Sequence, residues 1–413
     1  MKFRQVLPGR LLNVATPHEP THSPRRFDVG GITETIERAL AAAGLNTQSG
    51  PMKGVTDTIQ QALAAAGLSQ RSVTPSEHGV TIDGISREID APCNDIDGTP
   101  AEPAVHIEEP RHGEFLNRSF TNNAGTRTYK LYIPARYSFE SSQPVAMVVM
   151  LHGCTQSPDD FAAGTRMNAL ADRHGFLVIY PGQAANANGS RCWNWFRPED
   201  QNRDSGEPSL IAGITREVAS TYRVDGRRIY VAGMSAGAAM AVILGTIYPE
   251  LYVAVGAHSG LPYGAAYDMP SAFAAMQGGG TPPGPLNRSP ATSSNRPHAS
   301  GWIPTIVFHG DDDRTVDARN GIAIVEQATV AGPDHPPLRG NVQTGTALGG
   351  RKYSRTDYVD SANQPVVEHW IVHGAGHAWS GGSPSGSFTD ATGPDASAEM
   401  IRFFYSQRRA GTS

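Results

Sequence analysis

Short apolar runs alternate with helical stretches from about residue 115 to the end of the chain. The apolar runs are PVAMVVMLHG, FLVIYP, RIYVAGMS, YVAVGAHSG, IPTIVFHG and VVEHWIVHG. The helical stretches are GTRMNALADRHG, PSLIAGITREVASTY, AGAAMAVILGTIYP and ASAEMIRFFYSQ. Strands that are apolar throughout and alternate with helices are typical of a mostly parallel sheet covered on both faces. The pattern therefore predicts an α/β fold.

Two other segments differ from this alternation. EFLNRSFT (114–121) and TRTYKLYIP (126–134) alternate with a period of two around NNAG, which predicts a hairpin at an antiparallel edge of the sheet. The segment 261–300 is rich in Gly, Pro and Ser and carries a few apolar side chains. It is either a cap over a pocket or a plain insertion.

The first 110 residues have another character. ITETIERALAAAGL (32–45) recurs as VTDTIQQALAAAGL (55–68), with apolar positions spaced as on one face of a short helix. Such short helices are marginal alone and need a partner. From about residue 70 the chain is polar and Pro-rich, as linkers are. We expect a helical N-terminal appendage over 1–110 and the main α/β domain over 111–413. The repeat is either a loosely attached appendage or a binding element for a surface or a protein.

Composition narrows the classes of partner. The chain has 413 residues, 39% of them apolar, with a formal net charge of −5 and no dense basic run. Nucleic acid is therefore not an expected partner, and no polybasic membrane anchor is expected. Three cysteines without a CxxC pair argue against a structural metal site. The N-terminus shows no apolar h-region and no run approaches about 18 apolar residues, so we expect no signal peptide and no transmembrane helix, and the cytoplasm is the default compartment.

The stretch YVAGMSAGAAM (230–240) carries the candidate nucleophile. Gly233 to Gly237 fits G-x-S-x-G with a predicted strand before it and a helix after it. In such a nucleophile elbow the serine occupies a strained turn, and the glycines are needed where neighbouring backbone leaves no room for a Cβ. Ser235 is therefore the predicted nucleophile.

A serine nucleophile needs a base and an orienting acid, which follow it in chain order in this architecture. The loop HGDDDRTVD comes after one predicted strand, and HGAGHAWSGG comes after a later one. Both loops follow the carboxyl ends of strands, where catalytic groups of open α/β sheets lie. Four aspartates, Asp311, Asp312, Asp313 and Asp317, compete for the acid. Of the two histidines, His377 lies further into its loop and is the predicted base, whereas His373 directly ends the strand and is expected to be packed or hydrogen-bonded.

An oxyanion hole needs two backbone N–H groups aimed at the developing negative charge. One is expected from Ala236, which follows the nucleophile, and the other from Cys154, with Thr155 as the alternative, in LHGCTQ. Cys154 and Cys192 both sit in loops that follow strands at the same sheet edge, so a disulfide between them is one of two alternatives, the other being free thiols. Such a bond would favour an oxidising compartment and would conflict with the expected absence of a signal peptide.

Several of these motifs, in this order, resemble the polyhydroxybutyrate (PHB) depolymerase-type esterases of the α/β-hydrolase superfamily, close to feruloyl and acetylxylan esterases. The resemblance rests on LHGCTQSPDDFAAGTRMNALADRHGFLVIYP, RCWNWF, YVAGMSAGAAM, HGDDDRTV and GAGHAWSGG and covers about residues 115–407. Its acid loop has the frame H-G-x-x-D-x-x-V, which selects Asp313, and its histidine loop selects His377. The resemblance implies a serine esterase that needs no metal or organic cofactor, with Ser235, His377 and Asp313 as its triad.

The substrate is less constrained than the chemistry. Trp193 and Trp195 in RCWNWF are candidates for a pocket wall or for packing, and at most one is expected to line a pocket if the segment is extended. Thr155 and Met234 are further candidates for substrate contact. Hydroxyalkanoate oligomers or polymers are the leading substrates, carbohydrate-linked feruloyl or acetyl esters are the enzymatic alternative, and a granule-binding or surface-binding module is the non-enzymatic one.

Overall fold

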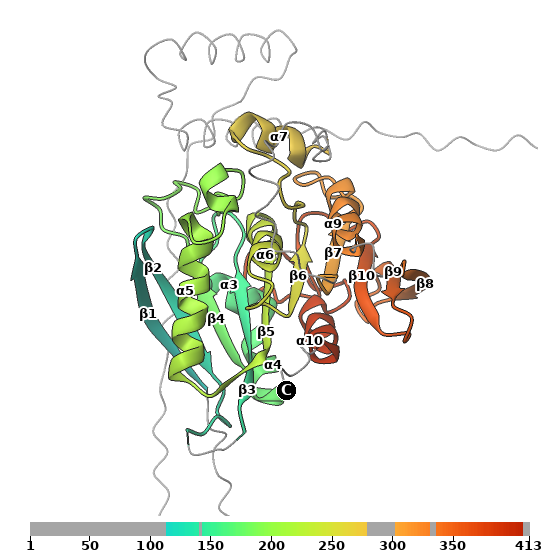
Figure 1. Cartoon of the computed structure of the whole chain (residues 1–413). Helices are drawn as coiled ribbons and strands as arrows, with labels where there is room; N and C mark the ends of the chain where they lie inside the picture. Colours follow the sequence, from blue (N-terminus) through green and yellow to red (C-terminus); the bar gives the residue numbers. More distant parts are fainter. Residues whose placement is uncertain (1–112, 140–142, 279–301, 331–335, 408–413) are drawn as a thin grey trace, which may run out of the picture. The chain divides into compact units, whose positions relative to one another are not determined.

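A ten-stranded sheet forms the centre of the part of the chain that is described, which comprises residues 113–139, 143–278, 302–330 and 336–407 of a computed structural model (Figure 1). The strand order is β1-β2-β4-β3-β5-β6-β7-β10-β9-β8. The six strands from β4 to β10 in this order run parallel, and a hairpin extends the sheet in antiparallel fashion at each edge. The predicted α/β fold with a mostly parallel sheet is confirmed.

The elements follow the chain as predicted over most of its length. The strands are β1 (Glu114–Asn122), β2 (Gly125–Ile133), β3 (Val145–Leu151), β4 (Leu177–Pro181), β5 (Val224–Met234), β6 (Ala254–His258), β7 (Thr305–Gly310), β8 (Arg339–Thr346), β9 (Lys352–Val359) and β10 (Pro365–Val372), with a small pair β11 (Trp379–Ser380) and β12 (Thr389–Asp390). The helices are α3 (Pro158–Thr165), α4 (Met167–His174), η1 (Pro198–Gln201), α5 (Gly206–Thr221), α6 (Ala236–Ile247), α7 (Met269–Met276), α9 (Arg319–Thr329) and α10 (Ala396–Ser406).

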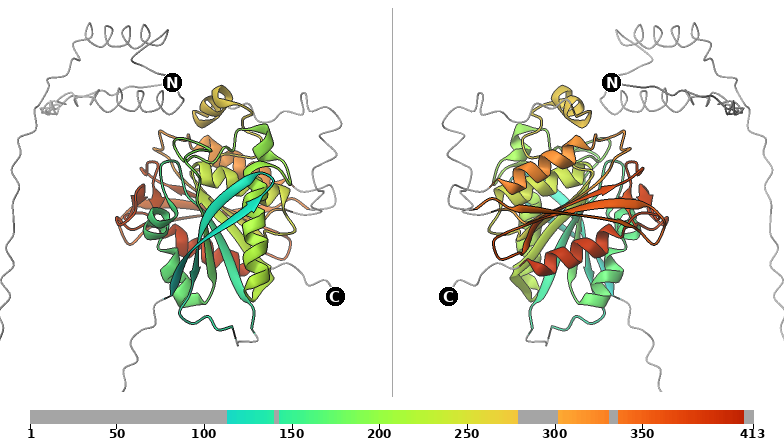
Figure 2. Two further views of the ribbon diagram at one scale, coloured as in Figure 1. Left: turned by 90° about the vertical axis from the view of Figure 1, so that its left-hand side faces the viewer. Right: turned by 90° about the vertical axis from the view of Figure 1, so that its right-hand side faces the viewer.

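Helices cover both faces of the sheet (Figure 2). On one face, α5, α6 and α9 pack on the sheet in a core that includes Ile211, Met240 and Ile324. On the other face, α3, α4 and α10 form a second core. Because apolar side chains are buried on both faces, the central strands have no polar side to show, which is why their sequences read as continuous apolar runs.

Two short connections, from β5 to α6 and from β7 to α9, lie at the edge of the sheet where the parallel strands end. The chain turns from β5 into α6 at Ser235 without any intervening loop. The chain between β7 and α9 is the aspartate-rich loop. All parallel strands therefore deliver their following loops to one edge of the sheet.

Some predicted features lie outside the described residues. These are the N-terminal appendage with its repeat and residues 279–300 of the insertion. The described start of the insertion, 261–278, contains helix α7. Within the described residues, none of the helices is both long and apolar enough to span a membrane.

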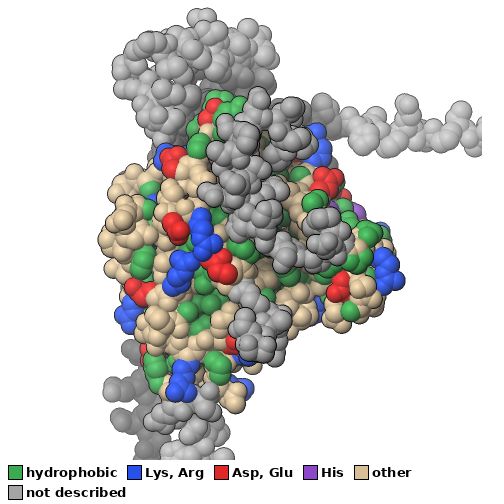
Figure 3. All heavy atoms as spheres, viewed as in Figure 1, with side chains coloured by type: hydrophobic (Ala, Val, Ile, Leu, Met, Phe, Trp, Pro, Cys, Tyr) green, Lys and Arg blue, Asp and Glu red, His purple; other side chains and the backbone are tan. Residues whose placement is uncertain are grey.

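On the face shown in Figure 3, basic and acidic side chains are interspersed. The ion pair between Arg203 and Glu250 is one of several of this kind. A mixed surface of this kind produces no large field of one sign. The expectation that nucleic acid is not a partner stays a prediction.

Candidate active site

Ser235 lies on a strained turn between β5 and α6. Its backbone has φ 55° and ψ −122°, a combination that residues other than glycine rarely adopt. Its side chain is largely buried. Its N–H donates to the carbonyl of His258 at the end of β6, at 2.9 Å. The turn is therefore held from the neighbouring strand, directly after the end of β5.

The two glycines of the motif are sterically required. A Cβ on Gly237 would lie 2.1 Å from the carbonyl oxygen of Leu151 and 2.5 Å from that of His152. A Cβ on Gly233 would lie 2.4 Å from the backbone of Gly237. These neighbours are backbone atoms that cannot rotate away, so the spacing of the motif follows from the close approach of β3, β5 and α6.

The acid and the base of the prediction are hydrogen-bonded to each other. His377 Nδ1–H donates to Asp313 Oδ2 at 2.7 Å. The other carboxylate oxygen of Asp313 accepts the N–H groups of Thr315 and Val316, each at 2.9 Å. Burial raises the pKa of Asp313, but the hydrogen bond and charge of His377 outweigh it, so the pKa falls to about 2. Asp313 is thus a fixed carboxylate that orients the ring of His377.

The competing aspartates have other partners. Asp311 accepts from His373 Nδ1 at 2.8 Å, and the second ring nitrogen of His373 is bonded to Ser354 Oγ at 2.8 Å. Asp312 pairs with Arg314, and Asp317 pairs with Arg319. His373 is therefore hydrogen-bonded at both ring nitrogens, whereas His377 Nε2 has no hydrogen-bond partner among the described residues.

The nucleophile and the acid–base pair lie on the same sheet edge. Strands β5, β6, β7 and β10 are consecutive neighbours, and Ser235, His258, Asp313 and His377 all come at or after their carboxyl ends. Among the described residues, the Ser235 hydroxyl has no hydrogen-bond partner. Catalytic hydrogen bonds are often long in enzymes without substrate, so this geometry is compatible with a base that engages the serine when an ester binds.

His258 links the two halves of this arrangement, and sequence reasoning missed it. Its carbonyl accepts from Ser235 N–H, and its ring Nε2 accepts from Ser380 N–H at 2.9 Å, three residues after His377. The ring stacks between Phe308 and Trp379. Burial, and then the charges of His309 and His377, lower the pKa of His258 to about 3, so the ring is neutral and can accept this hydrogen bond. The only sequence signal was a histidine at the end of an apolar strand.

The loop after β3 approaches the nucleophile from the other side. A Cβ built on Gly153 would lie 3.6 Å from the Cβ of Ser235. In this loop Gly153 N–H donates to Gln156 Oε1 at 2.9 Å, and Thr155 N–H donates to the carbonyl of Ser190 at 2.7 Å. Among the described residues, the Cys154 N–H between them has no acceptor. The amide of Thr155, the alternative oxyanion donor, is thus already used, and that of Cys154 is available.

The second oxyanion donor of the prediction is Ala236. It is the first residue of α6, and the first N–H groups of a helix have no acceptor within the helix. Ala236 is 3% exposed and follows Ser235 directly. Its amide therefore lies at the positive end of α6, where negative charge is stabilised.

Cys154 and Cys192 form a disulfide. The loop that carries Cys192 also contains the two predicted aromatic residues. Trp193 has no exposed surface and donates through Nε1 to the His152 carbonyl at 3.1 Å, while Trp195 is 6% exposed. Met234 is 1% exposed. Of the four residues considered for substrate contact, Thr155 alone is exposed in the described structure, and the placement of both tryptophans favours packing.

Groups of three or more His, Cys, Asp or Glu side chains suited to hold a metal ion do not occur among the described residues. The chemistry of the site can be assessed from the side chains and amides already named. A hydroxyl on a strained turn, an imidazole fixed by a carboxylate and two unpaired amides are the parts that acyl transfer requires.

Comparison with known proteins agrees with this fold. A sheet of this order with a strand–serine–helix elbow defines an α/β-hydrolase. Residues 127–330 match the family described as Esterase PHB depolymerase. This part of the chain is thus similar to the PHB depolymerase-type esterases of the α/β-hydrolase superfamily.

Individual relatives are similar over part of their length. Poly(3-hydroxyalkanoate) depolymerase C of Paucimonas lemoignei is 32% identical over 265 residues, which are 63% of this chain and 60% of that protein. Feruloyl esterase B of Talaromyces funiculosus is 27% identical over 267 residues, 63% of this chain and 71% of that protein. The acetyl xylan esterase structure from Aspergillus awamori superposes with a TM-score of 0.51 at 18% identity, covering 70% of this chain and 99% of that one, and shows the shared fold. The chain thus spans about 60% of the length of the depolymerase it matches.

Proposed function

We propose that this protein is a serine esterase that cleaves the carboxylic ester bonds of poly- or oligo-hydroxyalkanoates. The observation that carries the proposal is the strained Ser235 on the same sheet edge as the hydrogen-bonded pair of Asp313 and His377. The similarity to the depolymerase of Paucimonas lemoignei supports the choice of substrate class.

The proposed reaction has two steps. His377 Nε2 takes the proton of the Ser235 hydroxyl as its oxygen attacks the ester carbonyl, and Asp313 holds the ring and stabilises its positive charge. The N–H groups of Cys154 and Ala236 stabilise the oxyanion. The alcohol leaves with the proton from His377, and water, deprotonated by His377, then hydrolyses the acyl-enzyme. The groups proposed for these steps all belong to the chain, and no metal or cofactor is invoked.

A carbohydrate-linked ester is the alternative substrate. The similarity to feruloyl esterase B of Talaromyces funiculosus, which the chain covers over 71% of that protein's length, favours it as a second candidate. The two candidates share the triad and differ in the pocket for the acyl and alcohol groups. Relative kcat/KM values on hydroxybutyrate oligomers and on feruloyl or acetylated sugars separate them.

The N-terminal segment 1–110 is proposed as a targeting element for a polymer granule or a surface, on the basis of its repeated amphipathic pattern. Deletion of this segment is expected to reduce binding to granules while hydrolysis of a small soluble ester is kept. If the deletion changes neither property, the segment has no targeting role.

The compartment is proposed from the disulfide. A bond between Cys154 and Cys192 persists in oxidising surroundings, which supports an extracellular location over the cytoplasm that the N-terminal sequence favoured.

The test of the proposed function is hydrolysis of p-nitrophenyl butyrate by the wild type and by Ser235→Ala. We expect the variant to retain its fold and to lose activity by about 10⁴-fold or more, because no other group supplies the nucleophile. Equal activity in the two proteins would overturn the esterase proposal. A wild type that hydrolyses none of p-nitrophenyl butyrate, hydroxybutyrate oligomers and feruloyl or acetylated sugars would overturn it as well.

A further inference from the structure

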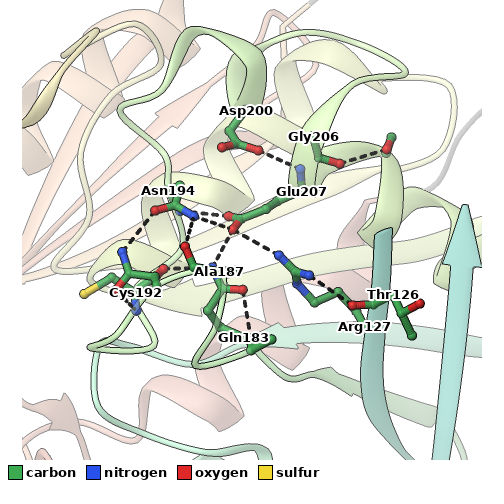
Figure 4. A network of polar contacts seen from close by, with 12 residues as sticks. Thr126, Arg127, Gln183, Ala187, Cys192, Asn194, Asp200, Gly206 and Glu207 are labelled. Atoms are coloured by element: carbon green, nitrogen blue, oxygen red, sulfur yellow. Dashed lines mark hydrogen bonds and ion pairs between the residues drawn. The ribbon is translucent and has the colours of Figure 1, made fainter. Parts of the chain in front are cut away.

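A buried polar network lies beneath the loop that carries Cys192 (Figure 4). At its centre is Glu207, in the first turn of α5 and 3% exposed. Its Oε2 accepts the backbone N–H of Asn194 at 2.8 Å, and its Oε1 accepts Asn194 Nδ2 at 2.7 Å. Gln183 Nε2 donates to the same Oε1, and Arg127 lies 3.4 Å away. A buried carboxylate with this many donors is a fixed point from which surrounding backbone is held.

The network holds the 183–194 loop at its two ends. Gln183 Nε2 donates to the carbonyl of Cys192 at 2.8 Å in addition to its bond with Glu207. Asn194 is held at both its backbone and its side chain by Glu207. The carbonyl and the flanking residue of Cys192 are therefore attached to the same carboxylate.

This loop is in turn attached to the proposed oxyanion loop by four connections. One is the Cys154–Cys192 disulfide, and the second is the bond from Thr155 N–H to Ser190. The other two reach His152, whose carbonyl accepts from Trp193 Nε1 at 3.1 Å and whose ring Nε2 accepts from Gln183 N–H at 3.1 Å. Burial lowers the pKa of His152 to about 4, so the ring is neutral and can accept.

We propose that Glu207 is a positioning residue for the oxyanion hole, acting through the 183–194 loop and the disulfide to fix the amide of Cys154 beside Ser235. The inference rests on the proposed esterase function. Glu207 would then affect the stability of the transition state without contacting the reacting atoms. The positive φ angles of Thr155 and Arg191 agree with it, because strained backbone persists only where its surroundings hold it in place.

Two charged side chains, those of Arg127 and Asp200, contact Glu207. Arg127 faces it from β2, and Asp200 of η1 accepts the Glu207 N–H at 2.7 Å. Burial and then the charge of Glu207 raise the pKa of Asp200 to about 7. The site thus sets two carboxylates against one guanidinium. Exchanging the Glu207 carboxylate for an amide removes its charge and one of the two acceptor oxygens on which Asn194 and Gln183 converge.

The test compares Glu207→Gln with Glu217→Gln. Glu217 lies on the same helix and accepts from the Tyr129 hydroxyl at 2.7 Å, so the control makes the same chemical change away from the loop. We expect kcat of folded Glu207→Gln on p-nitrophenyl butyrate to fall by about 10- to 100-fold, with KM changed by less than about 3-fold, because an oxyanion amide acts mainly in the transition state. Glu217→Gln is expected to stay near the wild type.

A second readout separates positioning from a loss of stability. A trifluoromethyl ketone that resembles the butyryl ester binds as an oxyanion, so its affinity for Glu207→Gln should fall in parallel with kcat, while the affinity for the product butyrate stays unchanged. If Glu207→Gln does not fold, Gln183→Met, which removes both the contact with Glu207 and that with Cys192, takes its place with the same expectation. A folded variant with the kcat and ketone affinity of Glu217→Gln would overturn the inference.

The Ser235→Ala protein, measured beside these variants, keeps the two proposals apart. If Ser235→Ala is as active as the wild type, the esterase mechanism fails and the positioning role fails with it. If Ser235→Ala is inactive and Glu207→Gln matches its control, the positioning inference alone is wrong.

Discussion

Removal of the Cys154–Cys192 disulfide is expected to lower the free energy of unfolding by a calculable amount. The bond closes a loop with a sequence separation of 38 residues. In the chain-entropy model, opening a loop of this size returns about 13 cal/mol/K to the unfolded chain, which corresponds to about 4 kcal/mol at 25 °C. For a domain of this size a loss of 1 kcal/mol lowers Tm by about 2 °C, so a fall of about 8 °C is expected.

The assay is denaturant unfolding of the wild type and of Cys192→Ala, each with and without reductant. Both proteins carry Cys93→Ala, which leaves Cys154 and Cys192 as the cysteines of the reference protein and Cys154 as that of the variant. We expect the oxidised wild type to be the most stable of the four samples. Cys192→Ala, for which reductant changes nothing, is the control that separates the disulfide from other effects of the reagent.

The outcome that refutes the reasoning is specific. A thiol reagent should count two additional free thiols in the reduced wild type. If these thiols appear while the unfolding curve stays where it was, closure of this loop does not stabilise the fold. Activity measured on the same samples then reports whether the Cys154 amide still lies in place without its covalent link.

Two further predictions concern the acid and the elbow. Asp313→Asn is expected to lower kcat by about 1,000-fold or more in steady-state assays, because the ring of His377 loses its orienting carboxylate. The folded-state pKa of Asp313 is about 2, below its ordinary 3.8, so this carboxylate stabilises the fold by about 2 kcal/mol above about pH 4, and the contribution is lost as the pH falls toward 2. The difference in unfolding free energy between the wild type and Asp313→Asn should therefore shrink between pH 4 and pH 2. A difference that grows on acidification would contradict the assignment. Gly237→Ala is expected to abolish activity and to lower Tm, since the new Cβ would lie 2.1 Å from a β3 carbonyl, whereas Gly226→Ala, which meets no atom within 4 Å, should behave as the wild type in both measurements.

The sequence allowed the central sheet to be predicted because its strands are apolar on both faces. The hairpin of β8 and β9 was missed for the opposite reason. β8, with the sequence RGNVQTGT, is exposed along nearly its whole length, so it shows no alternation of apolar and polar positions. Helix α3 was not predicted, and the predicted helical stretch GTRMNALADRHG corresponds to α4.

The candidate site was predictable where chemistry is tied to a motif. Ser235 and its glycines follow from the elbow, and the loop positions of Asp313 and His377 follow from the strands before them. Glu207 was not predictable, since an acidic residue in the first turn of a helix is ordinarily a solvated partner of the helix dipole. Its burial depends on Arg127 and on a loop that is distant in sequence, and neither is visible as a local pattern.

The aspartate-rich loop supplies two acid–imidazole pairs from residues two positions apart. Asp311 with His373 and Asp313 with His377 have nearly equal hydrogen-bond lengths, 2.8 and 2.7 Å. The distance between acid and ring therefore does not distinguish a clip that ties strands together from a general base. The distinction lies in the far nitrogen of each ring, which Ser354 occupies in one pair and which is vacant among the described residues in the other. Anyone who transplants this site into another scaffold has to keep that nitrogen free for the Ser235 hydroxyl, because a second hydroxyl bonded to it would compete with the proposed nucleophile.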